Sequence, residues 1–254
     1  MSTIINTLRS LIFYVGYALT MITISLTACI AGLFLPRAVV MKQICIGWCN
    51  FSVWWARVCC GVHYQVIGRE NIPEGACVVI AKHQSAWETL FLQSLFYPAA
   101  TVLKQELLDI PFFGWGLRFF DPIAINRADR KNALKAVINQ GKEKLTQGRR
   151  VVIFPEGTRT LPGADTTYSA GGAMLAHSAK ALVLPVALNS GDCWPRGTLI
   201  KTPGMITVVI GEPIDAAKYS SKELNDLTKA WIETKVAEIR QVAKPARIGE
   251  PMSS

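Results

Sequence analysis

The sequence carries few charged residues, and near its N-terminus it has a long run without any. Charged side chains make up 18% of the 254 residues, and none lies between Arg9 and Arg37. A helix of about 20 apolar residues is long enough to cross a lipid bilayer. Because a core helix is rarely so long and so apolar, we expect residues 11–35 to form a membrane-inserted helix.

Cysteine pairs with the spacing of metal or redox sites are also missing. The seven cysteines are scattered, no Cys-x-x-Cys pair occurs, and Cys45 and Cys49 have no second pair at a zinc-site spacing. We interpret the cysteines as free thiols that serve as small apolar side chains. An odd number of scattered cysteines is typical of a protein from a reducing compartment.

Three further absences narrow the range of functions. No Gly-x-Ser-x-Gly elbow is present, which disfavours a serine hydrolase. The only histidines are His63, His83 and His177, and without a His-Glu-x-x-His motif a metal enzyme would have too few ligands. Neither a tract rich in lysine and arginine nor a zinc finger occurs. We therefore expect no metal and no nucleic acid partner.

What is present is a basic and apolar chain. It has 27 Lys and Arg against 18 Asp and Glu, a formal net charge of +9, and half of its residues are hydrophobic. This combination favours an anionic membrane surface or an anionic substrate. Arg37, Lys42 and Arg57 follow the apolar run, whereas only Arg9 precedes it. Because basic flanks tend to stay in the cytoplasm, we expect the rest of the chain on that side of the membrane.

A second apolar segment, residues 39–60, follows Pro36. It is rich in aromatic side chains and has basic residues near its ends, a composition typical of the lipid headgroup region. The two segments together predict a membrane-associated helical hairpin over residues 1–60, which either spans the bilayer or dips into one leaflet. The alternative is that the second helix packs on the domain that follows.

From residue 61 onward, short apolar runs alternate with helical patterns. Seven runs are predicted as strands: 63–67, 76–81, 101–104, 122–126, 150–154, 182–188 and 206–211. Four helices are predicted at 85–96, 129–147, 170–180 and 221–242. This alternation predicts an α/β fold with a mixed, largely parallel sheet flanked by helices. We place the domain at 61–243 and expect a flexible tail at 244–254.

Polar residues gather in the loops that follow four of the predicted strands. His83, Lys104 and Arg127 each lie at the end of such a strand, and the segment 154–159, Phe-Pro-Glu-Gly-Thr-Arg, ends another. In open α/β sheets, binding sites lie in the loops beyond the carboxyl ends of the strands. The convergence of a histidine, carboxylates and cations in these loops predicts a functional site.

The segment 81–90, Ala-Lys-His-Gln-Ser-Ala-Trp-Glu-Thr-Leu, supports two interpretations. Ser85 and Glu88 have the spacing of a capping box, in which Ser85 is the N-cap of a helix and Glu88 its third residue. His83 just before a helix, with a carboxylate in the first turn, also fits an oriented general base. The two roles are compatible, because a carboxylate has several acceptor sites.

Four sequence blocks occur in order between residues 60 and 215. They are His-x4-Glu at 83–88, a Gly/Phe turn at 111–115 followed by a strand ending at Arg127, the complete Phe-Pro-Glu-Gly-Thr-Arg at 154–159, and an apolar strand with proline at 183–187. In these blocks and their spacing the chain resembles the glycerolipid acyltransferase family, specifically the bacterial 1-acyl-sn-glycerol-3-phosphate acyltransferases. The third block is very specific, whereas the first alone is weak.

The resemblance implies transfer of a fatty acyl group from acyl-CoA or acyl-carrier protein to the free hydroxyl of 1-acyl-sn-glycerol-3-phosphate, giving phosphatidic acid in a bacterial inner membrane. It implies no cofactor beyond that acyl co-substrate. His83 would be the general base and Glu88 would orient it, without a covalent acyl-enzyme. The implied substrate-binding residues are Lys104, Arg127, Glu156, Gly157, Thr158 and Arg159, with Arg127 and Arg159 on phosphate and Gly157 in an unusual backbone conformation.

Two residues depart from the family's pattern. Glu88 stands where the family usually has aspartate, and its extra methylene adds about 1.5 Å of reach. Lys82 stands where asparagine is common, and the sequence leaves its role open. The alternative functions are acyl transfer to glycerol-3-phosphate or another lyso-lipid, hydrolysis of a thioester or lipid, and a non-catalytic membrane scaffold.

Overall fold

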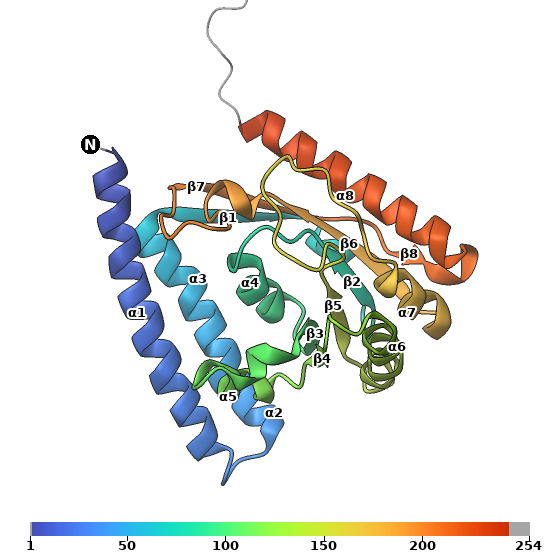
Figure 1. Ribbon diagram of the computed structural model, residues 1–254, viewed down its shortest axis with the longest axis horizontal. Coiled ribbons are helices and arrows are strands. Elements are labelled where there is room, and N and C mark those ends of the chain that lie inside the picture. Colours follow the sequence, from blue (N-terminus) through green and yellow to red (C-terminus); the bar gives the residue numbers. More distant parts are fainter. Residues whose placement is uncertain (1, 244–254) are drawn as a thin grey trace, which may run out of the picture.

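The structure, a computed structural model, describes residues 2–243, so the predicted tail at 244–254 lies outside the described residues. Its centre is an eight-stranded sheet in the order β1-β7-β6-β2-β5-β3-β4, with β8 paired to β6 (Figure 1). β7 and β8 run antiparallel to β6, and the other neighbouring pairs are parallel. The strands are β1 (Val62–Ile67), β2 (Val78–Ala81), β3 (Ala99–Lys104), β4 (Ile123–Ile125), β5 (Arg150–Ile153), β6 (Leu182–Leu188), β7 (Gly204–Ile210) and β8 (Ile214–Asp215).

Helices cover both faces of the sheet (Figure 1). The first face carries α1, α3, α4 and α5, and the second carries α6, α7 and α8. The α-helices are α1 (Ser2–Ala31), α2 (Arg37–Val39), α3 (Ile46–Cys60), α4 (Trp87–Leu95), α5 (Phe113–Phe119), α6 (Arg130–Thr146), α7 (Gly171–Ala179) and α8 (Ser221–Ala243). A π-helix, η1 (Val40–Cys45), joins α2 to α3, and the short 3-10 turns are η2 (Arg69–Asn71), η3 (Gln105–Asp109), η4 (Ser190–Asp192) and η5 (Ala216–Lys218).

The alternating side chains of β2 supply both hydrophobic cores. Val79 and Ala81 lie in the core shared with α1, α3 and α4, whereas Val78 and Ile80 lie in the core shared with α6, α7 and α8. Successive residues of a strand point to opposite faces of a sheet. A strand that is buried on both faces reads as a continuous apolar run, which is how β2 appears in the sequence.

The predicted α/β fold with a mixed, largely parallel sheet is confirmed. All seven predicted strands are present with ends shifted by at most a few residues, and the four predicted helices correspond to α4, α6, α7 and α8. Among the strands and α-helices that follow residue 60, two were not predicted. The two-residue strand β8 is too short to show a pattern, and α5 contains two glycines and follows Phe112, whose φ is 61°. The Gly/Phe block was expected to be a turn, and it leads into this short helix.

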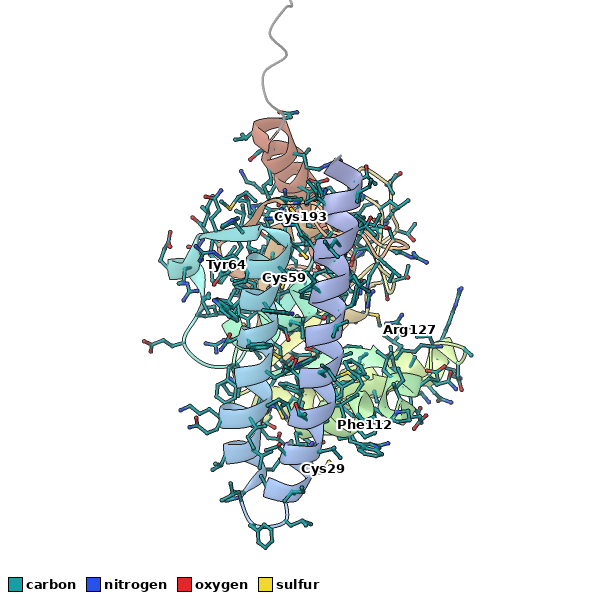
Figure 2. The ribbon with its side chains drawn as sticks, turned by 90° about the vertical axis from the view of Figure 1, so that its left-hand side faces the viewer. Cys29, Cys59, Tyr64, Phe112, Arg127 and Cys193 are labelled. Carbon is teal, nitrogen blue, oxygen red and sulfur yellow. The ribbon has the colours of Figure 1, made fainter. Side chains whose placement is uncertain are left out.

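The N-terminal hairpin is formed by α1 and α3, which lie side by side (Figure 2). Trp55 Nε1 donates to the carbonyl of Phe13 at 3.2 Å, and Trp48 Nε1 donates to the hydroxyl of Thr20 at 3.2 Å. Residues of both helices belong to the same core as the sheet and α4. The second helix therefore packs on the following domain as well as on α1, as the alternative interpretation anticipated.

The outer face of α1 is apolar and exposed. Among the described residues, one helix, Thr3–Ala31, is long and apolar enough to cross a membrane. Its exposed large side chains include Leu8, Leu11, Val15 and Leu19, each at least half exposed. These positions recur every three or four residues and so form one stripe along the helix.

Candidate active site

His83 and Glu88 form a hydrogen-bonded pair beyond the carboxyl end of β2. Nδ1 of His83 lies 2.9 Å from Oε1 of Glu88, which sits in the first turn of α4. The Glu88 side chain is fully buried, while 12% of the His83 side chain is exposed. The ring of Phe154 stacks on the imidazole with ring centroids 4.2 Å apart. The imidazole is therefore held both at its edge and on one face.

Glu88 is surrounded by hydrogen-bond donors. Oε1 accepts the N–H groups of Gln84 and Ser85, each at 2.7 Å, and Oε2 accepts the hydroxyl of Ser190 at 2.6 Å and that of Ser85. Burial by itself raises the pKa of Glu88, but the bonds from His83 and the two serines outweigh it, so the pKa lies below its ordinary value. An ionised carboxylate can only accept a hydrogen bond, so the contact with Glu88 favours the imidazole tautomer with its N–H at Nδ1, in which Nε2 is the acceptor atom.

The start of α4 differs from the predicted capping box by one residue. The N-cap is Ala86 rather than Ser85, and the helix begins at Trp87. The Ser85 hydroxyl accepts the N–H of Trp87 at 3.0 Å, and Glu88 accepts the N–H of Ser85 as it would in a capping box. A single carboxylate thus serves the turn and His83 together, so the capping and orienting contacts coexist.

The loop after β5 holds the backbone of His83. Thr160 donates its N–H and its hydroxyl to the carbonyl of His83, at 2.8 and 3.0 Å. Oε1 of Glu156 accepts the N–H of His83 at 3.3 Å. The Phe-Pro-Glu-Gly-Thr-Arg loop therefore contacts the main chain of His83 through Glu156 and its side chain through the ring of Phe154.

Gly157 turns this loop with a left-handed backbone. Its φ is 68°, which residues with a side chain rarely adopt, so the backbone conformation predicted for Gly157 is confirmed. Arg127, labelled in Figure 2, donates a guanidinium N–H to the carbonyl of Gly157. Arg127 thus supports the loop in this structure, and its contact with a substrate phosphate stays a prediction.

A pocket of about 260 Å³ opens beside the turn formed by Ser85 and Ala86. Arg159 lines it, as does Arg196 from the segment after η4, and Arg196 donates to the carbonyl of Arg159 at 2.6 Å. Tyr14 of α1 lines the same pocket. These two guanidinium groups form a cationic pocket of the kind that binds phosphate. The pocket borders the turn between His83 and Glu88, the two residues that we call the dyad. Arg196 lies outside the four sequence blocks and was not predicted.

Lys104 and Thr158, two further predicted binding residues, lie at exposed positions. Lys104 ends β3, and its ammonium pairs with Oε1 of Glu106 at 2.9 Å. Thr158 follows Gly157 at the tip of the loop after β5. Substrate contact by either residue stays a prediction.

Ser190, the donor to Glu88, was not found from the sequence. It follows β6, which pairs in parallel with β2. A polar residue after a strand is the kind of signal that marked His83, but the order of strands is needed to bring the two strand ends together. Ser190 therefore becomes recognisable only once β6 is known to lie beside β2.

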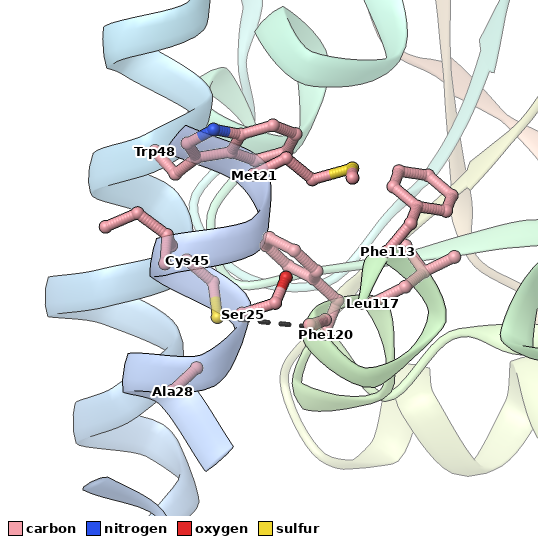
Figure 3. A pocket seen from close by; sticks show the side chains of 10 residues that line it. Met21, Ser25, Ala28, Cys45, Trp48, Phe113, Leu117 and Phe120 are labelled. Atoms are coloured by element: carbon pink, nitrogen blue, oxygen red, sulfur yellow. Dashed lines mark hydrogen bonds between the residues drawn. The ribbon is translucent and has the colours of Figure 1, made fainter. Parts of the chain in front are cut away.

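An apolar cavity of about 30 Å³ lies between α1, η1, α3 and α5 (Figure 3). Its lining includes Met21, Trp48, Phe113 and Leu117, with Ser25 among its few polar residues. Its volume is about a tenth of that of a small ligand pocket, so it is a void in the apolar packing between these helices.

The chain is similar to known acyltransferases over most of its length. A family model described as "Acyltransferase" matches residues 63–189. The 1-acyl-sn-glycerol-3-phosphate acyltransferase of Pseudomonas aeruginosa is 41% identical over 99% of this chain and 98% of its own. The enzyme of that name from Borreliella burgdorferi is 30% identical over 74% of this chain and 74% of its own.

A solved structure has the same fold. The crystal structure of the 1-acyl-sn-glycerophosphate (LPA) acyltransferase from Thermotoga maritima superposes with a TM-score of 0.79 at 26% identity, covering 98% of this chain and all of that chain. The residues matched by the family model include His83, Glu88 and the loop that holds them. On the family match and the full-length similarity, the chain belongs to the acyltransferase family.

Proposed function

We propose that this protein transfers a fatty acyl group from acyl-CoA or acyl-carrier protein to the free hydroxyl of 1-acyl-sn-glycerol-3-phosphate, giving phosphatidic acid. The observation that carries the proposal is the 2.9 Å contact between Nδ1 of His83 and Oε1 of Glu88. The names of the relatives from Pseudomonas aeruginosa and Thermotoga maritima support the choice of acceptor.

In the proposed mechanism, Nε2 of His83 is the general base. It takes the proton of the acceptor hydroxyl as that oxygen attacks the thioester carbonyl, so a C–O bond forms, the C–S bond breaks and the thiol leaves with a proton. The Glu88 anion stabilises the imidazolium that forms, as the acid of a serine-hydrolase triad does. The acceptor's own hydroxyl is the nucleophile, so no covalent acyl-enzyme is needed.

The acceptor phosphate is placed in the pocket lined by Arg159. This pocket borders Ser85 and Ala86, which lie between the two members of the dyad in the sequence. A guanidinium group can bind two phosphate oxygens at once. The free hydroxyl of the acceptor is a few bonds from its phosphate, so a phosphate bound there would leave the hydroxyl near the turn between His83 and Glu88, as attack on the thioester requires.

Membrane attachment is assigned to α1. Its stripe of exposed leucine and valine side chains needs an apolar partner, and lipid acyl chains supply one. The acceptor is itself a membrane lipid, so an enzyme held at the bilayer meets it without extracting it into water. From the excess of basic residues after α1, we place the catalytic domain on the cytoplasmic side of a bacterial inner membrane.

An assay of the full-length protein in detergent tests this proposal. Labelled acyl-CoA and acyl-carrier protein are offered with 1-acyl-sn-glycerol-3-phosphate, glycerol-3-phosphate, a lyso-lipid without a terminal phosphate, or no acceptor. We expect phosphatidic acid as the main product. Release of free fatty acid without an acceptor would instead indicate a hydrolase, and preference for another acceptor would contradict the assigned substrate.

The orienting role of Glu88 is tested by Glu88→Gln. Glutamine keeps the size of the side chain and can still accept the backbone N–H of Ser85, because it serves in capping boxes. It removes the negative charge that stabilises the imidazolium. We expect a folded variant with a strongly reduced kcat, whereas full activity would leave Glu88 with the capping role alone.

A further inference from the structure

Lys82 lies directly before His83 but on the other face of the sheet. The N–H of Lys82 donates to the carbonyl of Val186 at 3.0 Å, so the pairing of β2 with β6 continues through it. Neighbouring residues of an extended chain point to opposite faces. The side chain of His83 contacts Glu88 of α4, and that of Lys82 contacts Glu233 of α8.

The Lys82 ammonium is buried between two carboxylates. Its side chain is 2% exposed, and Nζ lies 2.6 Å from Oε1 of Glu233 and 3.3 Å from Oε1 of Glu156. The hydroxyl of Tyr168 donates to the same oxygen of Glu233 at 2.9 Å. A buried charge is tolerated only when it is paired and hydrogen-bonded, and these contacts meet that requirement.

Glu156 links this cluster to the catalytic residue. The oxygen that contacts Lys82, Oε1, also accepts the N–H of His83 at 3.3 Å. The Glu156 side chain is 1% exposed, and its Oε2 is buried without a hydrogen-bond partner among the described residues. Burial raises the pKa of Glu156 despite the opposing charge of Lys82. The Lys82 ammonium opposes this rise, so it favours the ionised form of the carboxyl that accepts the His83 N–H.

We propose that Lys82 is a positioning residue, which with Glu156 and Glu233 fixes the backbone of His83 from the α8 face of the sheet. The inference rests on the proposed role of His83 in acyl transfer. It assigns a part in catalysis to α8, which lies beyond residues 63–189 that the family model matches. Among the described residues, the Lys82 ammonium pairs with Glu233 and Glu156 and not with the side chain of Glu88, and Lys82 does not line the pocket of Arg159, so it acts through Glu156 and the main chain.

The decisive variant is Lys82→Met, which keeps an unbranched side chain and removes the charge. A small displacement of a catalytic group costs up to about 100-fold in rate. We expect kcat to fall about 10- to 100-fold while the acceptor KM stays within about twofold, because the phosphate pocket is not altered. Lys229→Met is the matched control, since Lys229 also approaches Tyr168 but is 35% exposed and, among the described residues, pairs only with Asp165 at 3.8 Å.

A double-mutant cycle separates positioning from a merely structural role. If Lys82 acts through Glu156, then Lys82→Met combined with Glu156→Gln lowers kcat by little more than the more severe single change. Independent effects would multiply and would contradict the proposed route. If Lys82→Met does not fold, Glu233→Gln decides, because it removes the negative charge of one of the two carboxylates that pair with the lysine and must lower kcat without raising the acceptor KM.

The proposal fails if folded Lys82→Met or Glu233→Gln has the wild-type kcat, or if only KM changes. That failure differs from failure of the proposed function, in which the wild-type protein itself does not acylate 1-acyl-sn-glycerol-3-phosphate. Melting temperature and far-UV circular dichroism establish that each compared variant is folded.

Discussion

The hydroxyl of Ser190 donates to Oε2 of Glu88 across 2.6 Å, although the two residues are 102 positions apart in the chain. Oε1 of the same carboxylate faces His83 at 2.9 Å. Ser190 therefore belongs to the machinery that keeps Glu88 ionised and in place, at a position which no sequence block contains.

Ser190→Ala should weaken both stability and catalysis. A hydrogen bond to a buried charge is worth about 1.5–3 kcal/mol, so the free energy of unfolding should fall by that order and kcat by about tenfold. Denaturant unfolding and the acyl-transfer assay measure the two effects. Ser178→Ala is the matched control, because within residues 2–243 the hydroxyl that it removes bonds only to the carbonyl of Leu175 in α7. Unchanged kcat in folded Ser190→Ala would show that Glu88 does not need this donor.

The two arginines that line the pocket, Arg159 and Arg196, should determine the affinity for the acceptor. If both guanidinium groups bind the acceptor phosphate as proposed, Arg159→Ala and Arg196→Ala should each raise the acceptor KM about 10- to 100-fold, while the donor KM stays near the wild-type value. Initial rates at varied acceptor and donor separate the two constants. The exposed Arg69 of η2, outside this pocket, supplies the control Arg69→Ala. If the donor KM rises instead, the pocket binds the acyl donor and not the acceptor.

Lys201 should make stability depend on pH. Its ammonium is buried against the rings of Tyr14, Trp194 and Phe13, with Nζ 3.5, 4.3 and 4.4 Å from their centroids. Burial lowers the pKa of Lys201 to about 8 from an ordinary value of 10.5. Between these values the unfolded chain binds a proton that the folded chain does not, so the contribution of Lys201 to stability rises with pH.

Melting curves of wild type and Lys201→Met at about pH 7 and about pH 9.5 check this sign. Because other groups titrate in the same range, the quantity to compare is the difference between the two proteins at each pH. Wild type should gain melting temperature relative to the variant as pH rises. A difference that stays constant would mean that Lys201 titrates alike in the folded and unfolded chain.

The outer face of α1 should govern membrane attachment. Phe13 and Ala28 of α1 are buried in the core, so deleting the helix would open the fold, and a change on its exposed face is the cleaner test. Leu11→Asp with Val15→Asp places two charges there, each costing about 2.5–3.5 kcal/mol within a bilayer. We expect the variant to be folded but largely lost from sedimented vesicles. Leu227→Asp, on the exposed surface of α8, is the control.

The sequence predicts most of this site where the contacts are local. His83 and Glu88 are five residues apart, so a helix start is enough to bring them together, and the strands appear as apolar runs because both faces of the sheet are covered. Local patterning also placed Ser85 at the start of α4, although the N-cap is one residue later. Contacts between residues that are close in the sequence could therefore be predicted.

Contacts between distant segments could not be predicted in the same way. Ser190 reaches Glu88 because β6 lies beside β2, and Lys82 reaches Glu233 because α8 crosses the second face of the sheet. Neither the strand order nor the docking of a helix is encoded in a local pattern. From the sequence, packing of α3 on the domain was only the alternative interpretation. Aromatic side chains suit a protein core as well as a lipid headgroup region, so the composition of α3 did not distinguish the two.

The most direct test of the central claim is the kcat of His83→Ala for transfer of a labelled acyl group to 1-acyl-sn-glycerol-3-phosphate. His83 is held by Glu88, Glu156 and Thr160, and those contacts are meaningful for catalysis only if the imidazole is the base. We expect kcat to fall by about 10²–10⁴-fold in a protein that remains folded. A folded His83→Ala protein with a kcat within a few fold of wild type would contradict the account.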